Sequence, residues 1–188
     1  MDDQQYINGD EIKRIARLRG KPIDVYESRR EVNERVQNNF KKRQSFGIES
    51  NLTSNSSYEI AKEANNQGYQ TKLFYIGVDE LEKLNQRIDE RVIRGFHYIS
   101  PQEVALRYQD SLNRLPGNLK WFDEANIFDN SVQIGSEDGS EEFTIPTLVL
   151  RAEKGILTSL DPSPPKWLQP ILPRILLIDE MNRKIQNL

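Results

Sequence analysis

The sequence contains no cysteine, only one histidine and no long apolar run. Without cysteine the chain forms no disulfide and has no thiolate for zinc binding or nucleophilic catalysis, which fits a reducing compartment. The longest apolar stretches, such as residues 175–178, are far too short to span a bilayer, and the acidic N-terminus is not a secretory signal. We therefore expect a cytoplasmic protein without a membrane partner, a metal site or a disulfide framework.

Strong charge of either sign is also lacking. The formal net charge is -3, which gives no general attraction to nucleic acid or anionic lipid. A length of 188 residues is enough for one domain with a proper core and a small appendage. The composition therefore excludes nucleic acid as an expected partner and favours a globular domain.

What is present is an alternation of strand-like and helix-like segments. The pattern predicts strands at residues 4–8, 45–50, 70–78 and 125–130, with helices at 10–19, 24–43, 56–67, 79–94, 100–115 and 118–123. Alternation of this kind is typical of an α/β fold with a mostly parallel sheet and helices on both faces, that is, three layers. The continuous apolar run TKLFYIGV indicates a strand buried on both faces. A Pro-Gly pair at residues 116–117 predicts a helix break.

The C-terminal part has a different pattern. A hairpin is expected from strands at 144–151 and 155–160, turned at Ala-Glu-Lys-Gly, followed by a helix over 173–186. Residues 175–180, ILLIDE, look like a Walker B strand, but apolar residues at helical spacing favour a helix instead. We therefore predict a core at 1–135 and an extension at 136–188, with a β-hairpin and a helix packed on that core.

Polar residues follow the ends of the predicted strands, where open parallel sheets bind ligands. These residues are Asn8, Asp10, Glu49, Asn51, Thr53, Asp79 and Asp129. After the third strand, Arg91 and Arg94 precede a glycine and Arg107 follows in the next helix, an arrangement that suits a mobile lid over phosphates. Carboxylates opposite arginines fit phosphoryl transfer.

Each of these residues also has an ordinary structural interpretation. Asp10 is suited to the first turn of a helix, where the helix dipole favours an anion. Glu49 ends a strand, Asn51 and Thr53 are suited to a loop, and the arginines are equally suited to a solvated helix face. The order of the motifs along the chain, rather than any one residue, favours a functional site.

The motifs YINGDEI, SFGIESNLTS, NNQGYQTKLFYIGV, RVIRGFHYISPQEVALRYQDSLNRL and ANIFDNS occur in this order over residues 6–130. This succession resembles the zeta-toxin-like P-loop kinases. The resemblance implies a P-loop kinase fold that uses ATP and Mg²⁺ to phosphorylate a hydroxyl of a small molecule or nucleotide sugar. It also implies a protein partner, such as an antitoxin, as one option.

The resemblance assigns roles to individual positions. It implies that Asp10 activates the acceptor hydroxyl and that Arg91 and Arg94 stabilise charge on the phosphates. The positions that it implies for substrate binding are Glu49, Asn51, Thr53 and Arg107.

The phosphate loop G-x-x-x-x-G-K-[ST] of this family is not in the sequence. The one Gly-Lys pair, Gly20-Lys21, is followed by Pro22, and the position five residues before Gly20 is Ile15. We therefore expect the first strand and phosphate loop to be missing, so that the ATP site is doubtful and this chain is inactive as a kinase. Alternatives are a truncated gene product, a non-catalytic module that keeps the acceptor pocket, and a split protein completed by a partner. Whether the chain is an enzyme therefore stays open.

Overall fold

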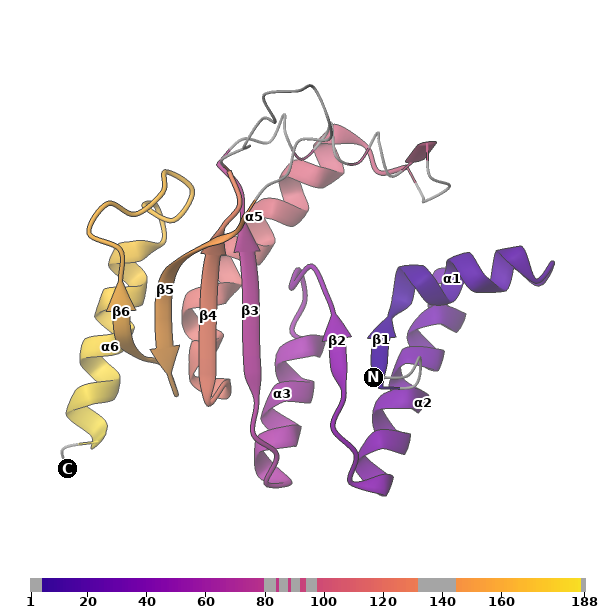
Figure 1. Ribbon diagram of the computed structural model, residues 1–188, viewed down its shortest axis with the longest axis horizontal. Helices are drawn as coiled ribbons and strands as arrows, with labels where there is room; N and C mark the ends of the chain where they lie inside the picture. Colours follow the sequence, from indigo (N-terminus) through magenta and orange to yellow (C-terminus); the bar gives the residue numbers. More distant parts are fainter. Residues whose placement is uncertain are drawn as a thin grey trace. The chain divides into compact units, whose positions relative to one another are not determined.

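The computed structural model describes residues 5–79, 84, 88, 92–93, 98–131 and 145–186. The chain forms two compact units, one of residues 1–51 with 88–99 and one of residues 52–87 with 100–188 (Figure 1). The boundary predicted at residue 135 falls inside the second unit. The helix predicted at 79–94 lies mostly outside the described residues.

The first unit is a small α/β arrangement. Its elements are β1 (Tyr6–Asn8), α1 (Gly9–Leu18), α2 (Val25–Lys42) and β2 (Gly47–Glu49). The strands β1 and β2 pair in parallel, with Asn8 opposite Glu49. Val36 and Phe40 of α2 and Ile7 of β1 are buried, so the apolar side of α2 faces the core of this unit.

The second unit holds the larger sheet. Its elements are α3 (Ser56–Asn66), β3 (Lys72–Gly77), α5 (Pro101–Asn118), the 3₁₀ helix η1 (Leu119–Trp121), β4 (Glu124–Asp129), β5 (Thr147–Glu153), β6 (Ile156–Leu160) and α6 (Leu172–Gln186). The strand order is β3-β4-β5-β6. The β3–β4 pair is parallel and the other two pairs are antiparallel.

The α/β class is confirmed, but instead of the expected single, mostly parallel sheet the described residues form a two-stranded parallel sheet and a four-stranded mixed sheet. The hairpin causes the mixture, because β5 pairs antiparallel with β4 and extends the sheet instead of packing on it as a separate layer. Within the described residues, every helix is too short or too polar to cross a bilayer.

Burial of β3 on both faces was predicted, and this prediction is wrong. Leu73 and Tyr75 are buried, whereas the side chains of Phe74 and Ile76 are 64% and 56% exposed. The reason is that α5 and α6 lie on one face of the sheet (Figure 1). The core on that face includes Tyr58, Leu73, Tyr75, Leu115, Ile127, Leu150, Leu168 and Ile175.

The predicted helix break at Pro116 is also wrong, because α5 continues to Asn118. Proline removes one helical hydrogen bond, but here it lies in the last turn and is fully buried in the core. The side chain of Asn118 donates to the carbonyl of Arg114 at 2.8 Å, which supports this turn. Burial of the ring therefore outweighs the lost hydrogen bond.

The hairpin and the C-terminal helix are confirmed. The turn uses only Lys154 and Gly155, with φ of 49° and 77°, the mirror-image turn that matches the twist of paired strands. Residues 175–180 are helical, as the spacing predicts. Asp179 of this segment accepts a hydrogen bond from the backbone N–H of Leu157 at 2.8 Å, so it anchors α6 to β6.

Trp167 packs directly on Gly77 at the end of β3. A Cβ atom added at Gly77 would overlap the indole ring. The Trp167 side chain is buried, and its ring lies 5.9 Å from that of Tyr75. The absence of a side chain at residue 77 is thus a requirement of the packing.

Gly77→Ala is expected to lower the free energy of unfolding by at least about 2 kcal/mol, because the new methyl group forces Trp167 out of its position. Chemical denaturation measures this change. The matched control is Gly117→Ala in α5, where the nearest atom to the new Cβ is Arg174 Nη2 at 3.8 Å. There, removal of a helical glycine is expected to stabilise the protein by roughly 0.5–1 kcal/mol. Equal effects of the two substitutions would contradict the close packing.

Candidate functional site

Two donors on β1 hold the carboxylate of Glu49 at the carboxyl end of β2. The hydroxyl of Tyr6 donates to Glu49 Oε2 at 2.6 Å, and Asn8 Nδ2 donates to the same oxygen at 2.7 Å. Tyr6 and Asn8 are two residues apart, so both side chains project from the same face of the strand. Tyr6 and Glu49 are exposed, which leaves this group accessible to a ligand.

The other end of the Asn8 side chain fixes the start of α1. Asn8 Oδ1 accepts hydrogen bonds from the backbone N–H of Asp10 at 2.9 Å and of Glu11 at 3.1 Å, so Asn8 is the N-cap of the helix. Asp10 therefore lies in the first turn, where the helix dipole stabilises its carboxylate. Its Oδ1 also forms an ion pair with Lys13 Nζ at 2.9 Å.

Tyr6 and Glu49 are coupled electrostatically. The hydrogen bond that the phenol donates to Glu49 raises the pKa of Tyr6 above its ordinary value of 10.0, with smaller contributions from burial and from the negative charge of Glu49. Tyr6 was not among the predicted site residues. The available signal was its spacing of two residues from Asn8 on a strand that ends at the predicted site.

The other predicted site residues are distributed between the units or lie outside the described residues. Asn51 is exposed just after β2 in the first unit. Thr53 and Arg107 belong to the second unit, where Arg107 in α5 forms an ion pair with Glu103. Arg91 and Arg94 lie outside the described residues. Among the described positions, one local network joins Glu49 to the backbone of Asp10 through Asn8.

The carboxyl ends of β3 and β4 are closed by Trp167 instead. Asp79 Oδ1 accepts a hydrogen bond from the backbone N–H of Trp167 at 2.8 Å, and Asp129 Oδ1 accepts one from its indole N–H at 2.9 Å. The hydroxyl of Ser131 also donates to Asp129 Oδ1. The same hydroxyl accepts a hydrogen bond from the backbone N–H of Asp79 at 2.8 Å. These two carboxylates therefore stabilise the fold, although the sequence placed them on the predicted rim.

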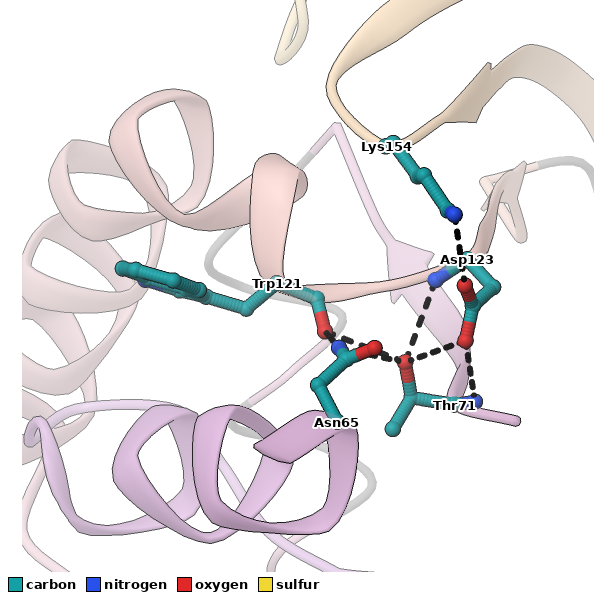
Figure 2. A network of polar contacts seen from close by, with 5 residues as sticks. All are labelled: Asn65, Thr71, Trp121, Asp123 and Lys154. Atoms are coloured by element: carbon teal, nitrogen blue, oxygen red, sulfur yellow. Dashed lines mark hydrogen bonds and ion pairs between the residues drawn. The ribbon is translucent and has the colours of Figure 1, made fainter. Parts of the chain in front are cut away.

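A second polar network ties the opposite ends of β3 and β4 together (Figure 2). Asp123 Oδ2 accepts from the backbone N–H of Thr71 at 2.8 Å and from its hydroxyl at 3.2 Å. The backbone N–H of Asp123 in turn donates to Thr71 Oγ1 at 3.1 Å. Asn65 donates to the Trp121 carbonyl, and Lys154 Nζ lies 3.6 Å from Asp123 Oδ1. This network is at the amino end of the parallel pair, away from the end where such sheets bind ligands.

The Gly-Lys pair of this chain is not part of a phosphate loop, and the ATP and Mg²⁺ that the resemblance implies stay a prediction. Gly20 has a φ of 70° and follows α1, so the Gly20-Lys21 pair lies after a helix and not in a strand-to-helix phosphate loop. In the described part of the chain, no group of three or more His, Asp or Glu side chains is placed to hold a metal ion.

A concave stretch of about 610 Å³ lies along one face of α2. Its lining residues are Tyr26, Arg29, Arg30, Asn33, Glu34, Gln37, Asn38 and Lys41. They recur at helical spacing along one exposed side, and neither Asp10 nor Glu49 is among them. We therefore attribute no site to this stretch.

Comparison with known proteins adds no relative. No family model, no curated protein and no solved structure matches this chain. The resemblance to zeta-toxin-like kinases thus stays a prediction from the motifs.

Glu49→Gln is expected to bring the pKa of Tyr6 down toward 10.0, because the charged acceptor that favours the protonated phenol is lost. The raised pKa of Tyr6 stabilises the native state below pH 10, and this stabilisation is lost as pH rises through the folded-state pKa. NMR titration of the ¹³C-labelled tyrosines measures the pKa of Tyr6. Glu34→Gln on α2 serves as the control, and an unchanged Tyr6 pKa in Glu49→Gln would contradict the hydrogen bond.

Asp123→Asn is expected to reduce stability by roughly 1–2 kcal/mol at neutral pH and to flatten its acid dependence. Hydrogen bonds from the backbone N–H of Thr71 chiefly lower the pKa of Asp123 below 3.8. The ionised carboxylate therefore stabilises the fold above pH 3.8, and the effect is lost as pH falls through the folded-state pKa. Urea unfolding at a series of pH values tests this, with exposed Glu59→Gln as control. If stability falls equally at low pH in Asp123→Asn and in the unmodified chain, protonation of Asp123 is not the cause of the loss.

Proposed function

We propose that this chain is the acceptor-binding part of a zeta-toxin-like, kinase-type α/β protein. In this proposal Asp10 and Glu49 bind a hydroxyl-bearing small molecule or nucleotide sugar, and the chain does not transfer a phosphoryl group by itself. One observation carries it: a single amide, that of Asn8, holds Glu49 with its nitrogen and fixes the helix turn of Asp10 with its oxygen.

The chemistry of this group suits an alcohol. Carboxylates accept hydrogen bonds from hydroxyl groups, and charge-assisted bonds of this kind are about twice as strong as neutral ones. Neighbouring hydroxyls of a sugar can each use one carboxylate, and the half-exposed ring of Tyr6 offers an apolar surface beside Glu49. A carboxylate at the position of Asp10 is also the group that would take the proton of a reacting hydroxyl.

The proposal assigns no site for the phosphoryl donor to this chain. The sequence holds no G-x-x-x-x-G-K-[ST] motif, and the Gly20-Lys21 pair follows a helix. Arg91 and Arg94 stay candidates for phosphate contacts through the resemblance alone. Binding of an acceptor without turnover is therefore the activity that the residues support best.

The test uses UDP-N-acetylglucosamine as the probe and isothermal titration calorimetry with thermal denaturation as readouts. The probe is expected to bind and raise the melting temperature, whereas ATP is not. Asp10→Ala and Glu49→Gln are each expected to weaken binding by about tenfold or more, the value of a hydrogen bond to a charged group.

Glu34→Gln is the matched control, because it removes an exposed carboxylate of the same unit outside the Asn8 network. Its affinity is expected to equal that of the unmodified chain. The proposal is wrong if the probe does not bind, or if it binds equally well to the Asp10 and Glu49 variants. Phosphorylated product in the presence of ATP would contradict the claim that the chain lacks transfer activity.

A further inference from the structure

The outer edge of β3 carries a regular row of backbone groups that point away from the sheet. The backbone N–H of Glu124 donates to the carbonyl of Thr71, and that of Asn130 donates to the carbonyl of Gly77. Odd-numbered residues of β3 therefore face β4 in this parallel ladder. It follows that Lys72, Phe74 and Ile76 direct both N–H and C=O to the opposite edge.

That edge is open in the part of the chain that the structure describes. No described strand pairs with β3 on this side. The open stretch ends at Val78, whose carbonyl accepts a hydrogen bond from the hydroxyl of Tyr108 at 2.9 Å. The residues Lys72, Phe74 and Ile76 thus leave three N–H groups and three C=O groups available to another extended backbone.

The usual protection of an edge strand is missing from β3. Such edges are normally blunted by proline, a bulge or free charges, and β3 has neither proline nor a register shift against β4. Its one charge, Lys72, is neutralised by Glu124, with Nζ 3.1 Å from the carboxylate. Phe74 is 64% exposed and stacks on Phe128 of β4, with ring centroids 6.5 Å apart, so apolar surface accompanies the open edge.

We propose that this edge is a dimer interface at which β3 of a second copy of the chain pairs antiparallel, with the two-fold axis at Phe74. In this register Phe74 faces Phe74 of the partner, and Lys72 faces the partner's Ile76. The two-fold axis adds the third pair, in which Ile76 faces the partner's Lys72. All three are hydrogen-bonded pairs, so each outward N–H finds a C=O of the other copy. The two four-stranded sheets become one continuous sheet.

A second copy is the occupant because the edge is self-complementary in both backbone and charge. The outward residues are symmetric about Phe74, which closes a two-fold interface without an unpaired group. The two Lys72 side chains lie four residues apart along the strand, roughly 13 Å, and each keeps its own Glu124. Like charges therefore do not oppose one another, and aromatic residues meet at the centre of the interface. This inference is independent of the proposed acceptor site.

Analytical ultracentrifugation over a range of concentrations tests the assembly. The unmodified chain is expected to form a reversible dimer, and Phe74→Lys is expected to be monomeric, because two ammonium groups would meet at the axis. Leu148→Lys is the matched control: it places the same charge on β5, away from the edge, and should still dimerise. Circular dichroism checks that both variants fold. A chain that stays monomeric at all concentrations, or equal loss of dimer in both variants, overturns the proposal.

Cysteine crosslinking tests the register in a chain that has no cysteine of its own. Hydrogen-bonded antiparallel partners have Cα atoms about 5.5 Å apart, within the range of a disulfide. Phe74→Cys should therefore give a disulfide-linked dimer on mild oxidation, and Ser159→Cys on the outer strand β6 should not. Efficient crosslinking of Ser159→Cys with none at residue 74 would assign the contact to another edge and overturn the proposal.

Discussion

The indole of Trp167 occupies the space that a side chain at residue 77 would need, and much of the second unit depends on that contact. From this position its ring N–H reaches Asp129 and its backbone N–H reaches Asp79, so one residue binds the carboxyl ends of two parallel strands. It also brings the segment before α6 against the sheet. Trp167 therefore connects Gly77 at the end of β3, the two aspartates and the proline-rich segment around the tryptophan in one set of contacts.

These contacts explain why the carboxylates predicted at the strand ends are of two kinds, those that Trp167 binds and those that it does not. A pattern of aspartates after strands indicates where ligands bind, but it does not show whether another part of the chain already uses them. Asp79 and Asp129 are bound by a tryptophan that lies 88 and 38 residues further along the chain, a separation that local patterns do not reveal. Glu49 lies opposite Asn8 because β1 and β2 pair in parallel, and Asp10 follows Asn8 in the first turn of α1. The role of Tyr6 depended on the register of that pair and was missed.

The fold was predictable where local signals decide it. The Lys154-Gly155 turn and the helical spacing in α6 act over a few residues, and the structure has them where the sequence indicates. Predictions that depend on which surfaces meet were less successful. The apolar run of β3 gave no information on how many helices cover the sheet, and Pro116 is retained within α5 because its ring is buried in the core. Hydrophobicity indicates that a residue can be buried, whereas tertiary contacts decide whether it is.

The division of the chain also separates its spectroscopic signals. Both tryptophans, Trp121 and Trp167, belong to the second unit, and the first unit has none. Intrinsic tryptophan fluorescence therefore follows only the second unit as the chain unfolds, while α1 and α2 of the first unit contribute to far-ultraviolet circular dichroism. Melting curves from the two methods coincide only if the units unfold together. A difference between them would reveal that each unit has a stability of its own.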